Sequence, residues 1–140
     1  MMSETHDGGC LCGAIRYRTR GAPLQSNVCH CRFCQRRSGS AFSIPIYFND
    51  DQIEFNAAPR TSYQHHSDES GRWIRVEFCP RCGTTVTWIS QRRPGLRGIA
   101  GGTYDDPDWY SIERHIWTRS AQRTATIPAG VTCFEMGMPG

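Results

Sequence analysis

The sequence contains no lysine, because all 16 residues counted as lysine or arginine are arginines. Schiff-base catalysis and a lysine general base are therefore excluded. No apolar run approaches the ~20 residues that a membrane-spanning helix needs. Residues 1–7 contain neither the basic nor the apolar segment of a secretory signal. We therefore expect a cytoplasmic protein that has no membrane partner.

The charge balance gives little support to a nucleic-acid partner. The formal net charge is +3, from 16 basic and 13 acidic residues. Seven cysteine thiolates around two Zn²⁺ ions would bring this charge to about zero. Neighbouring arginines, such as Arg36 with Arg37 and Arg92 with Arg93, are typical of solvated surfaces. We therefore do not expect the protein to bind nucleic acid.

Short stretches of alternating apolar and polar residues predict a mainly β protein. One helical turn is expected at residues 34–37, within a loop over residues 28–39. Pro45 predicts an edge position or a bulge for its strand, and residues 68–71 predict a hairpin turn. The tail from Ser120 is expected to be mostly coil. The predicted strands cover residues 12–18, 41–48, 52–55, 61–65, 72–78, 84–89, 97–101 and 112–117.

The eight cysteines are grouped rather than scattered. Eight in 140 residues are fewer than a disulfide-stapled small protein uses. In a reducing cytosol they remain thiols, which favours metal binding over disulfides. Cys133 stands alone and is expected to be a buried or half-exposed side chain. The other seven form three groups: Cys10 and Cys12; Cys29, Cys31 and Cys34; Cys79 and Cys82.

The segment from Cys79 to Gly83 has the spacing of a zinc knuckle. Two thiolates three positions apart can hold one metal from a tight turn, and Gly83 permits the sharp exit from that turn. A tetrahedral site needs two more ligands, and Cys10 and Cys12 are the natural partners because they begin a strand that could pair nearby. Four protein thiolates leave no open coordination position, so the expected role is structural. Spacing alone does not fix this pairing.

Cys29, Cys31 and Cys34 supply three sulfur ligands within six residues. Three protein ligands leave the fourth position of a zinc ion to water or substrate, which is the arrangement of a catalytic site. A substrate thiol suits that position because zinc lowers its pKa. Two alternatives remain open: a structural site completed by His30 or another histidine, and a redox-active group of thiols.

The histidines are weaker candidates for the site. His30 lies between two expected ligands, so its side chain should point away from their metal and lie beside the site or at the surface. The others could act as general bases but are more commonly hydrogen-bonded structural residues. These are His65, His66 and His115.

Three motifs in order resemble the glutathione-dependent formaldehyde-activating enzyme family, which also includes centromere protein V. They are GGCLCGAIRY at residues 8–17, CHCRFCQRRSGS at 29–40 and FCPRCG at 78–83, and GTYDDP at 102–107 is similar to a later motif. The resemblance covers residues 8–117 and leaves 118–140 as the C-terminal tail of a single domain over 1–140.

This resemblance implies a mainly β fold of packed antiparallel sheets with zinc knuckles, like that of the Mss-four-like proteins. The family's reaction joins formaldehyde to glutathione as S-hydroxymethylglutathione and is classed with carbon–sulfur lyases. The implied ligands are Cys10, Cys12, Cys79 and Cys82 for a structural zinc, and Cys29, Cys31 and Cys34 for a second zinc at which glutathione is activated.

We therefore expect a zinc enzyme that makes or cleaves a thiol–aldehyde adduct, with a glutathione-like thiol as its partner. Arg32, Arg36 or Arg37 could pair with the carboxylates of glutathione, since a guanidinium offers two parallel donors. The alternatives are a non-catalytic, zinc-stabilised binding module and a thiol redox switch. Exposed edge strands would allow a homodimer.

Overall fold

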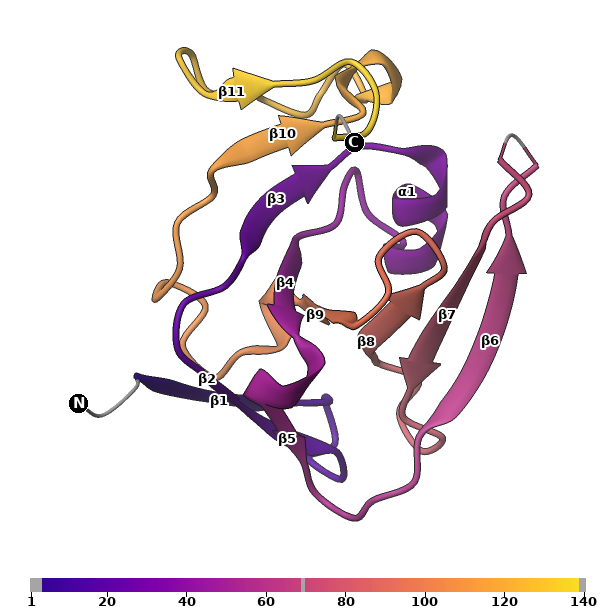
Figure 1. The fold of residues 1–140 in the computed structure, drawn as a ribbon. Helices are drawn as coiled ribbons and strands as arrows, with labels where there is room; N and C mark the ends of the chain where they lie inside the picture. Colours follow the sequence, from indigo (N-terminus) through magenta and orange to yellow (C-terminus); the bar gives the residue numbers. More distant parts are fainter. Residues whose placement is uncertain (1–3, 69, 139–140) are drawn as a thin grey trace.

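The structure is a computed structural model that describes residues 4–68 and 70–138. Its strands form a small sheet at one end of the molecule and a large sheet that extends toward the other end (Figure 1). The small sheet has the order β1 (Thr5–Gly9), β2 (Arg16–Arg20) and β5 (Ile53–Phe55). The large sheet has the order β11 (Thr132–Cys133), β10 (Arg114–Ile116), β3 (Gln25–Cys29), β4 (Pro45–Asn49), β9 (Leu96–Ala100), β8 (Thr85–Ser90), β7 (Trp73–Phe78) and β6 (Thr61–His66).

Short helices occupy several connections between the strands. The described helices are α1 (Arg32–Ser38) and the 3₁₀ segments η1 (Asp50–Gln52), η2 (Gly101–Thr103) and η3 (Thr118–Ser120). None of these helices is long and apolar enough to cross a membrane.

The expected fold of mainly β structure in packed sheets is confirmed, but the pairing is not antiparallel throughout. β10 runs parallel to both β3 and β11, so the large sheet is mixed. Residues 28–39, expected to form a loop with one helical turn, contain the end of β3 and the longer helix α1. The strands β1, β3 and β11 lie outside the predicted strand segments.

β4 is an interior strand, which corrects the edge position or bulge expected from Pro45. It lies between β3 and β9 and pairs antiparallel with both. Pro45 is its first residue and faces Ala100 of β9. A proline is tolerated at the start of a strand because its missing N–H falls where the hydrogen-bond ladder begins.

The small sheet has one buried and one exposed face, which follow from the alternation in β2. Tyr17 and Thr19 are buried, while Arg18 and Arg20 between and after them are exposed. On the exposed face, Arg18 Nε donates to a carboxylate oxygen of Asp7 on β1 at 2.7 Å. The buried face is thus left free to pack against the large sheet.

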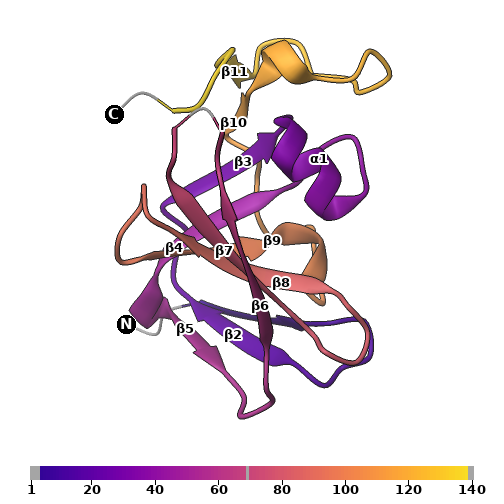
Figure 2. The same cartoon turned by 90° about the vertical axis from the view of Figure 1, so that its right-hand side faces the viewer.

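The main core lies between the two sheets, and a second cluster lies at the other end of the molecule. In the main core, Tyr17 of the small sheet packs in one cluster with Ile46 and Phe48 of β4. The second cluster surrounds Cys29 and Cys34. Figures 1 and 2 agree in placing the end that holds α1, β10 and β11 away from the small sheet.

Candidate metal centres and an adjoining cleft

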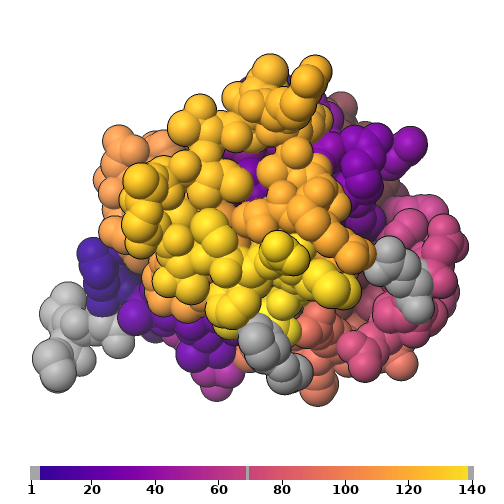
Figure 3. All heavy atoms as spheres, turned by 90° about the horizontal axis from the view of Figure 1, so that it is seen from above, coloured from indigo at the N-terminus to yellow at the C-terminus, as the bar shows by residue number. Residues whose placement is uncertain are grey.

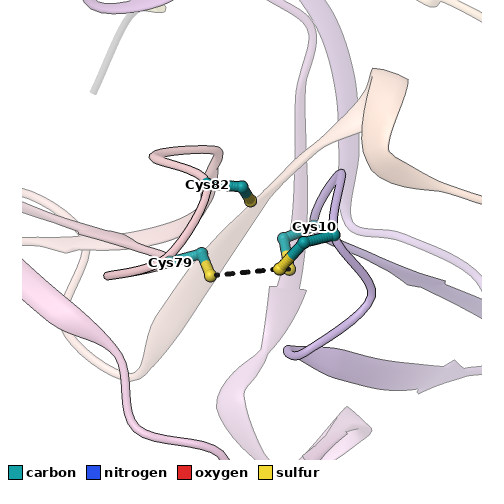
Figure 4. A group of neighbouring side chains, drawn as sticks. Cys10, Cys79 and Cys82 are labelled. Atoms are coloured by element: carbon teal, nitrogen blue, oxygen red, sulfur yellow. Dashed lines mark hydrogen bonds between the residues drawn. The ribbon is translucent and has the colours of Figure 1, made fainter.

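The first cysteine group joins the two sheets. Cys10 and Cys12 follow β1 of the small sheet, whereas Cys79 and Cys82 follow β7 of the large sheet. Their four sulfur atoms lie within 4.8 Å of one another. The Sγ of Cys12 is 3.7 Å from the Sγ of Cys10 and 3.7 Å from that of Cys79. Figure 4 shows Cys10 facing Cys79 and Cys82 across the space between two loops. The fold therefore brings the two outer groups together, as the expected pairing requires.

The two loops that carry these cysteines have the same construction. In each, the residue after the second cysteine is a glycine in the left-handed region, with φ of 81° in one loop and 80° in the other. In each, a backbone N–H also donates to the first sulfur: Ile15 N to Cys10 Sγ at 3.2 Å, and Arg81 N to Cys79 Sγ at 3.4 Å. Because a donor aimed at sulfur favours the thiolate, the Ile15 N–H prepares the sulfur of Cys10 to bind a cation.

The pKa values within this group diverge because each sulfur has different hydrogen-bond donors and different neighbouring sulfurs. Burial alone would raise the pKa of Cys10, but a backbone N–H and the neighbouring thiols lower it below its ordinary value. The hydroxyl and N–H of Thr84 lower the pKa of Cys82 to about 5. The N–H of Ala14 favours the thiolate of Cys12, yet burial and the neighbouring sulfurs raise its pKa to about 11. A divalent cation would remove this mutual repulsion between thiolates.

This group supplies four sulfurs, enough for every ligand of a tetrahedral ion, but it is partly exposed to water. Cys10 and Cys79 are buried, Cys82 is half-buried and Cys12 is exposed. Four sulfurs would fill every position of a tetrahedral ion. No position would remain for a substrate, although one edge of the group faces solvent.

The second cysteine group lies where β3 leads into α1. Cys29 is the last residue of β3, Cys31 is the N-cap of α1 and Cys34 lies in its first turn. Their sulfurs lie within 4.8 Å of one another, and Cys29 Sγ is 3.5 Å from Cys31 Sγ. The backbone N–H of Cys34 donates to Cys31 Sγ at 3.3 Å. The start of one short helix therefore fixes the spacing of this trio.

The trio stabilises one thiolate, at Cys34, and disfavours a second and a third. Hydrogen bonds from Cys29 and Cys31, with smaller contributions from Ser43 and Arg37, hold the pKa of Cys34 well below its ordinary value. The thiols of Cys31 and Cys34 raise the pKa of Cys29. Although Cys29 favours its thiolate, Cys34 and burial raise the pKa of Cys31 to about 11. Full deprotonation of the trio therefore calls for a cation among the sulfurs.

The histidine between two of these cysteines is buried and directed elsewhere. His30 is fully buried, and its Nε2 lies 2.9 Å from Nδ1 of His115 on β10. The side-chain amide of Gln35 donates to the carbonyl oxygen of His30 at 2.7 Å. These contacts tie the loop between Cys29 and Cys31 to β10 and to α1. Of the two placements expected for His30, beside the site or at the surface, the structure shows the first.

The trio opens on a cleft of about 590 Å³. Small-molecule sites span roughly 300–1,000 Å³. Four guanidinium groups line it, and its described lining residues include no Asp or Glu. Such a cleft attracts anions. The arginines are Arg37, Arg72, Arg92 and Arg93, and the aromatic residues that line the cleft with them are Phe33, Tyr47, Trp73, Trp88 and Trp117.

Two of these arginines are held against aromatic rings. The guanidinium of Arg37 lies 4.4 Å from the centre of the Trp88 ring. That of Arg93 lies 4.7 Å from the centre of the Tyr47 ring and donates to Gln25 Oε1 at 2.9 Å. Stacking restricts both side chains, so less conformational entropy would be lost when they bind an anion.

The other residues expected near the site divide between the cleft and the rest of the surface. Arg37 and His65 line the cleft. Arg32 and Arg36 line a separate hollow beside α1. His66 is exposed on β6 and does not belong to the described cleft lining.

A wall of the cleft comes from the C-terminal tail, which is mostly coil, as expected from Ser120 onward. Residues 136–138 line the cleft, and Figure 3 shows the C-terminal residues spread over this end of the molecule. The N–H of Trp117 donates to the carbonyl oxygen of Met136 at 3.0 Å. Arg92 Nη2 donates to the carbonyl oxygen of Met138 at 2.6 Å. Cys133 in the same tail is exposed, which corrects the expectation of a buried or half-exposed side chain.

Comparison with known proteins identifies the family. A family profile described as "Glutathione-dependent formaldehyde-activating enzyme" matches residues 5–120. The chain belongs to this family. A protein of Halomonas elongata, provisionally named a glutathione-dependent formaldehyde-activating enzyme, is 30% identical over 126 residues, which cover 76% of this chain and 80% of that one.

The fold is also similar to a solved structure. A crystal structure of a Rhodobacter sphaeroides protein matches with a TM-score of 0.55 and 18% sequence identity, over 91% of this chain and 98% of that one. At this identity the likeness shows a shared fold alone. The family expected from the three cysteine motifs is confirmed by the profile and the Halomonas relative.

Proposed function

We propose that the chain is a zinc-dependent enzyme of the carbon–sulfur lyase type. Its substrate would be an adduct of a glutathione-like thiol and an aldehyde, such as S-hydroxymethylglutathione. The observation that carries this proposal is the opening of a three-cysteine group onto a cationic cleft. Three sulfurs leave one position of a tetrahedral ion for a ligand from the cleft.

Both cysteine groups fit zinc. A tetrahedron with Zn–S bonds of about 2.3 Å has edges of about 3.8 Å, close to the sulfur–sulfur distances of 3.5 and 3.7 Å. When bound at the trio, zinc would lower the pKa of a substrate thiol and hold it as a thiolate. We assign Cys10, Cys12, Cys79 and Cys82 to a structural zinc, and Cys29, Cys31 and Cys34 to a catalytic one.

The charge of the cleft suits glutathione, which carries two carboxylates and one ammonium group at neutral pH. Arg37 and Arg93 are presented to the cleft by aromatic rings. A guanidinium can bind a carboxylate through two parallel hydrogen bonds. These two arginines would therefore hold the peptide part of the substrate while its sulfur points to the trio.

His65 is our candidate for the group that moves the proton of the adduct. It is the histidine among the described cleft residues, and its ring lies 4.9 Å from that of Phe33. In cleavage, the electron pair of the C–S bond stays on sulfur, and the hydroxyl oxygen loses its proton as the C=O bond forms. The imidazole of His65 would accept this proton, and it would return it in the reverse direction.

Metal content and turnover test the proposal together. Protein purified without chelator is expected to carry two zinc ions per chain, one of which is lost readily, and to release formaldehyde from S-hydroxymethylglutathione. The variant Cys31→Ala is expected to keep one zinc and its circular-dichroism spectrum but to lose turnover. Full activity in this variant, or a single zinc in the parent protein, would contradict the proposal.

Thiol binding without turnover would instead favour a binding module. Zinc release on mild oxidation, if a reductant reverses it, would favour a redox switch.

The arginines provide a second test. Arg93→Met is expected to weaken glutathione binding by about tenfold, the effect of losing one charge-assisted contact. Arg123→Met is the matched control, because Arg123 is exposed and lies outside the described cleft lining. Equal affinities of the two variants, measured by calorimetry, would rule out the proposed orientation of the peptide.

A further inference from the structure

The cleft has more apolar wall than glutathione and formaldehyde require. Glutathione is a charged tripeptide and formaldehyde contributes a single carbon. The cleft beside the trio nevertheless presents Phe33, Trp73, Trp117, Met136 and Met138. Apolar surface left facing water in a binding site gains nothing until an apolar ligand covers it.

The C-terminal segment makes this apolar wall continuous with the trio. Met138, Phe134 and Trp117 pack around the cluster that contains Cys29 and Cys34. Gly137 lies against Arg92, since a Cβ at this position would be 2.9 Å from Nη1 of that arginine. The segment lies beyond residues 5–120, the part of the chain that the family profile matches. The wall therefore joins Met136 and Met138, which lie beyond the matched region, to residues within it, such as Trp117.

The polar and apolar parts of the cleft indicate two parts of one ligand. The arginines suit carboxylates, and the trio suits sulfur, as argued above. The aromatic and thioether side chains would then contact an apolar group bonded to that sulfur. Resting on the proposed function, we propose that the cleft prefers adducts whose aldehyde-derived group is large and apolar, with an aryl group or an alkyl chain of several carbons, over the formaldehyde adduct.

The chemistry of such a substrate balances without a further reactant. A hemithioacetal of glutathione has the form RS–CH(OH)–R′, with R′ the apolar group. Breaking its C–S bond leaves the electron pair on sulfur, forms the C=O bond of R′CHO and releases the hydroxyl proton, so that thiol and aldehyde are the products. The apolar wall would bind R′ and would thereby discriminate between aldehydes.

Stable thioethers test the inference without turnover. Calorimetry on the zinc-loaded protein would compare S-methylglutathione with S-hexylglutathione, which differ by five methylene groups. Each buried methylene strengthens binding by about fourfold. Because some of that gain is lost in ordering the chain, we expect S-hexylglutathione to bind at least about tenfold more tightly.

Variants localise the effect. Met138→Ala and Trp73→Ala are expected to weaken binding of S-hexylglutathione several times more than binding of S-methylglutathione. Tyr63→Ala is the control, because Tyr63 is 60% exposed on β6 and outside the described cleft lining, and it should leave the ratio unchanged. Thermal unfolding would confirm that each variant is folded.

The outcomes separate this inference from the function on which it rests. Equal binding of the methyl and hexyl derivatives would overturn the inference and leave the proposed function standing. A hexyl advantage that survives both Met138→Ala and Trp73→Ala would also overturn it, since the apolar group would then lie elsewhere. Failure of glutathione and both derivatives to bind would overturn the proposed function, and the inference with it.

Discussion

The indole of Trp88 lies directly over Gly98, its partner on the neighbouring strand β9. A Cβ at Gly98 would overlap the indole ring. In this position Trp88 Nε1 donates to the hydroxyl of Tyr47 at 3.2 Å, and Arg37 stacks on the indole. Gly98 therefore determines where the indole of Trp88, which lines the cleft, can lie.

Gly98→Ala is expected to displace Trp88 and to lower both stability and thiol binding. Overpacking of a buried position costs about 1–3 kcal/mol, and the displaced ring would no longer support Arg37. Urea unfolding and glutathione titration would measure the two effects. Gly102→Ala is a suitable control, because the added Cβ would meet no atom within 4 Å. An unchanged affinity in Gly98→Ala would show that Trp88 does not position the arginine.

The two cysteine groups should respond differently to substitution. Cys82→Ser removes one of the four proposed ligands in the group that joins the sheets, and structural zinc contributes about 10–16 kcal/mol in small domains. We expect this variant to lose both its zinc and its cooperative unfolding transition. Cys31→Ser should lose only the second zinc and unfold within a few degrees of the parent protein. Zinc analysis and thermal unfolding measured together would decide, and cooperative unfolding of Cys82→Ser at the parent temperature would contradict the structural assignment.

A mostly buried ion pair supports the large sheet. Arg97 Nη1 donates to Glu77 Oε1 at 2.8 Å, and the two side chains are 12% and 14% exposed. Arg97→Met should lower the free energy of unfolding by about 1–3 kcal/mol, because Glu77 would lose one of its two arginine partners while remaining largely buried. Arg18→Met, which breaks an exposed pair, should change urea unfolding little. Similar losses in both variants would mean that burial of the pair is irrelevant.

The pair formed by His30 and His115 should make stability fall in mild acid. Burial lowers the pKa of both imidazoles below the usual 6.5, so the folded chain keeps them neutral where the unfolded chain takes up protons. The free energy of unfolding should therefore be unaffected above pH 6.5 and fall as the pH drops below it. His115→Gln should reduce this slope by up to about 1.4 kcal/mol per pH unit. His66→Gln, at an exposed position, should retain the parent slope in urea titrations; identical slopes in all three proteins would refute the argument.

The tight turn from Cys79 to Gly83 could be predicted from local spacing, whereas β3 could not, because it depends on long-range pairing. This turn needs only two cysteines and Gly83, all within five residues. β3 contains the buried polar residues Ser26 and Asn27, so it lacks the alternation that indicates a strand. Asn27 is tolerated there because Arg114 of β10 donates to its Oδ1 at 2.8 Å. A partner that distant in sequence cannot be recognised from local periodicity.

The C-terminal wall of the cleft was unpredictable for a similar reason. The segment from Cys133 to Met138 has no period that indicates a strand or a helix. Its course depends on Trp117, whose φ of 57° turns the chain so that its N–H meets the carbonyl oxygen of Met136. A left-handed tryptophan has no sequence signature, so neither the wall nor the contribution of Met136 could be anticipated.

The position of the four-cysteine group between the sheets has a consequence for the response to metal scarcity. Its ligands come from both sheets, while those of the trio come from β3 and α1 alone. With the proposed assignments, zinc scarcity would empty the trio first, and the four-cysteine group would keep the two sheets joined. Activity would then be recovered by reloading one ion, without a new round of protein synthesis.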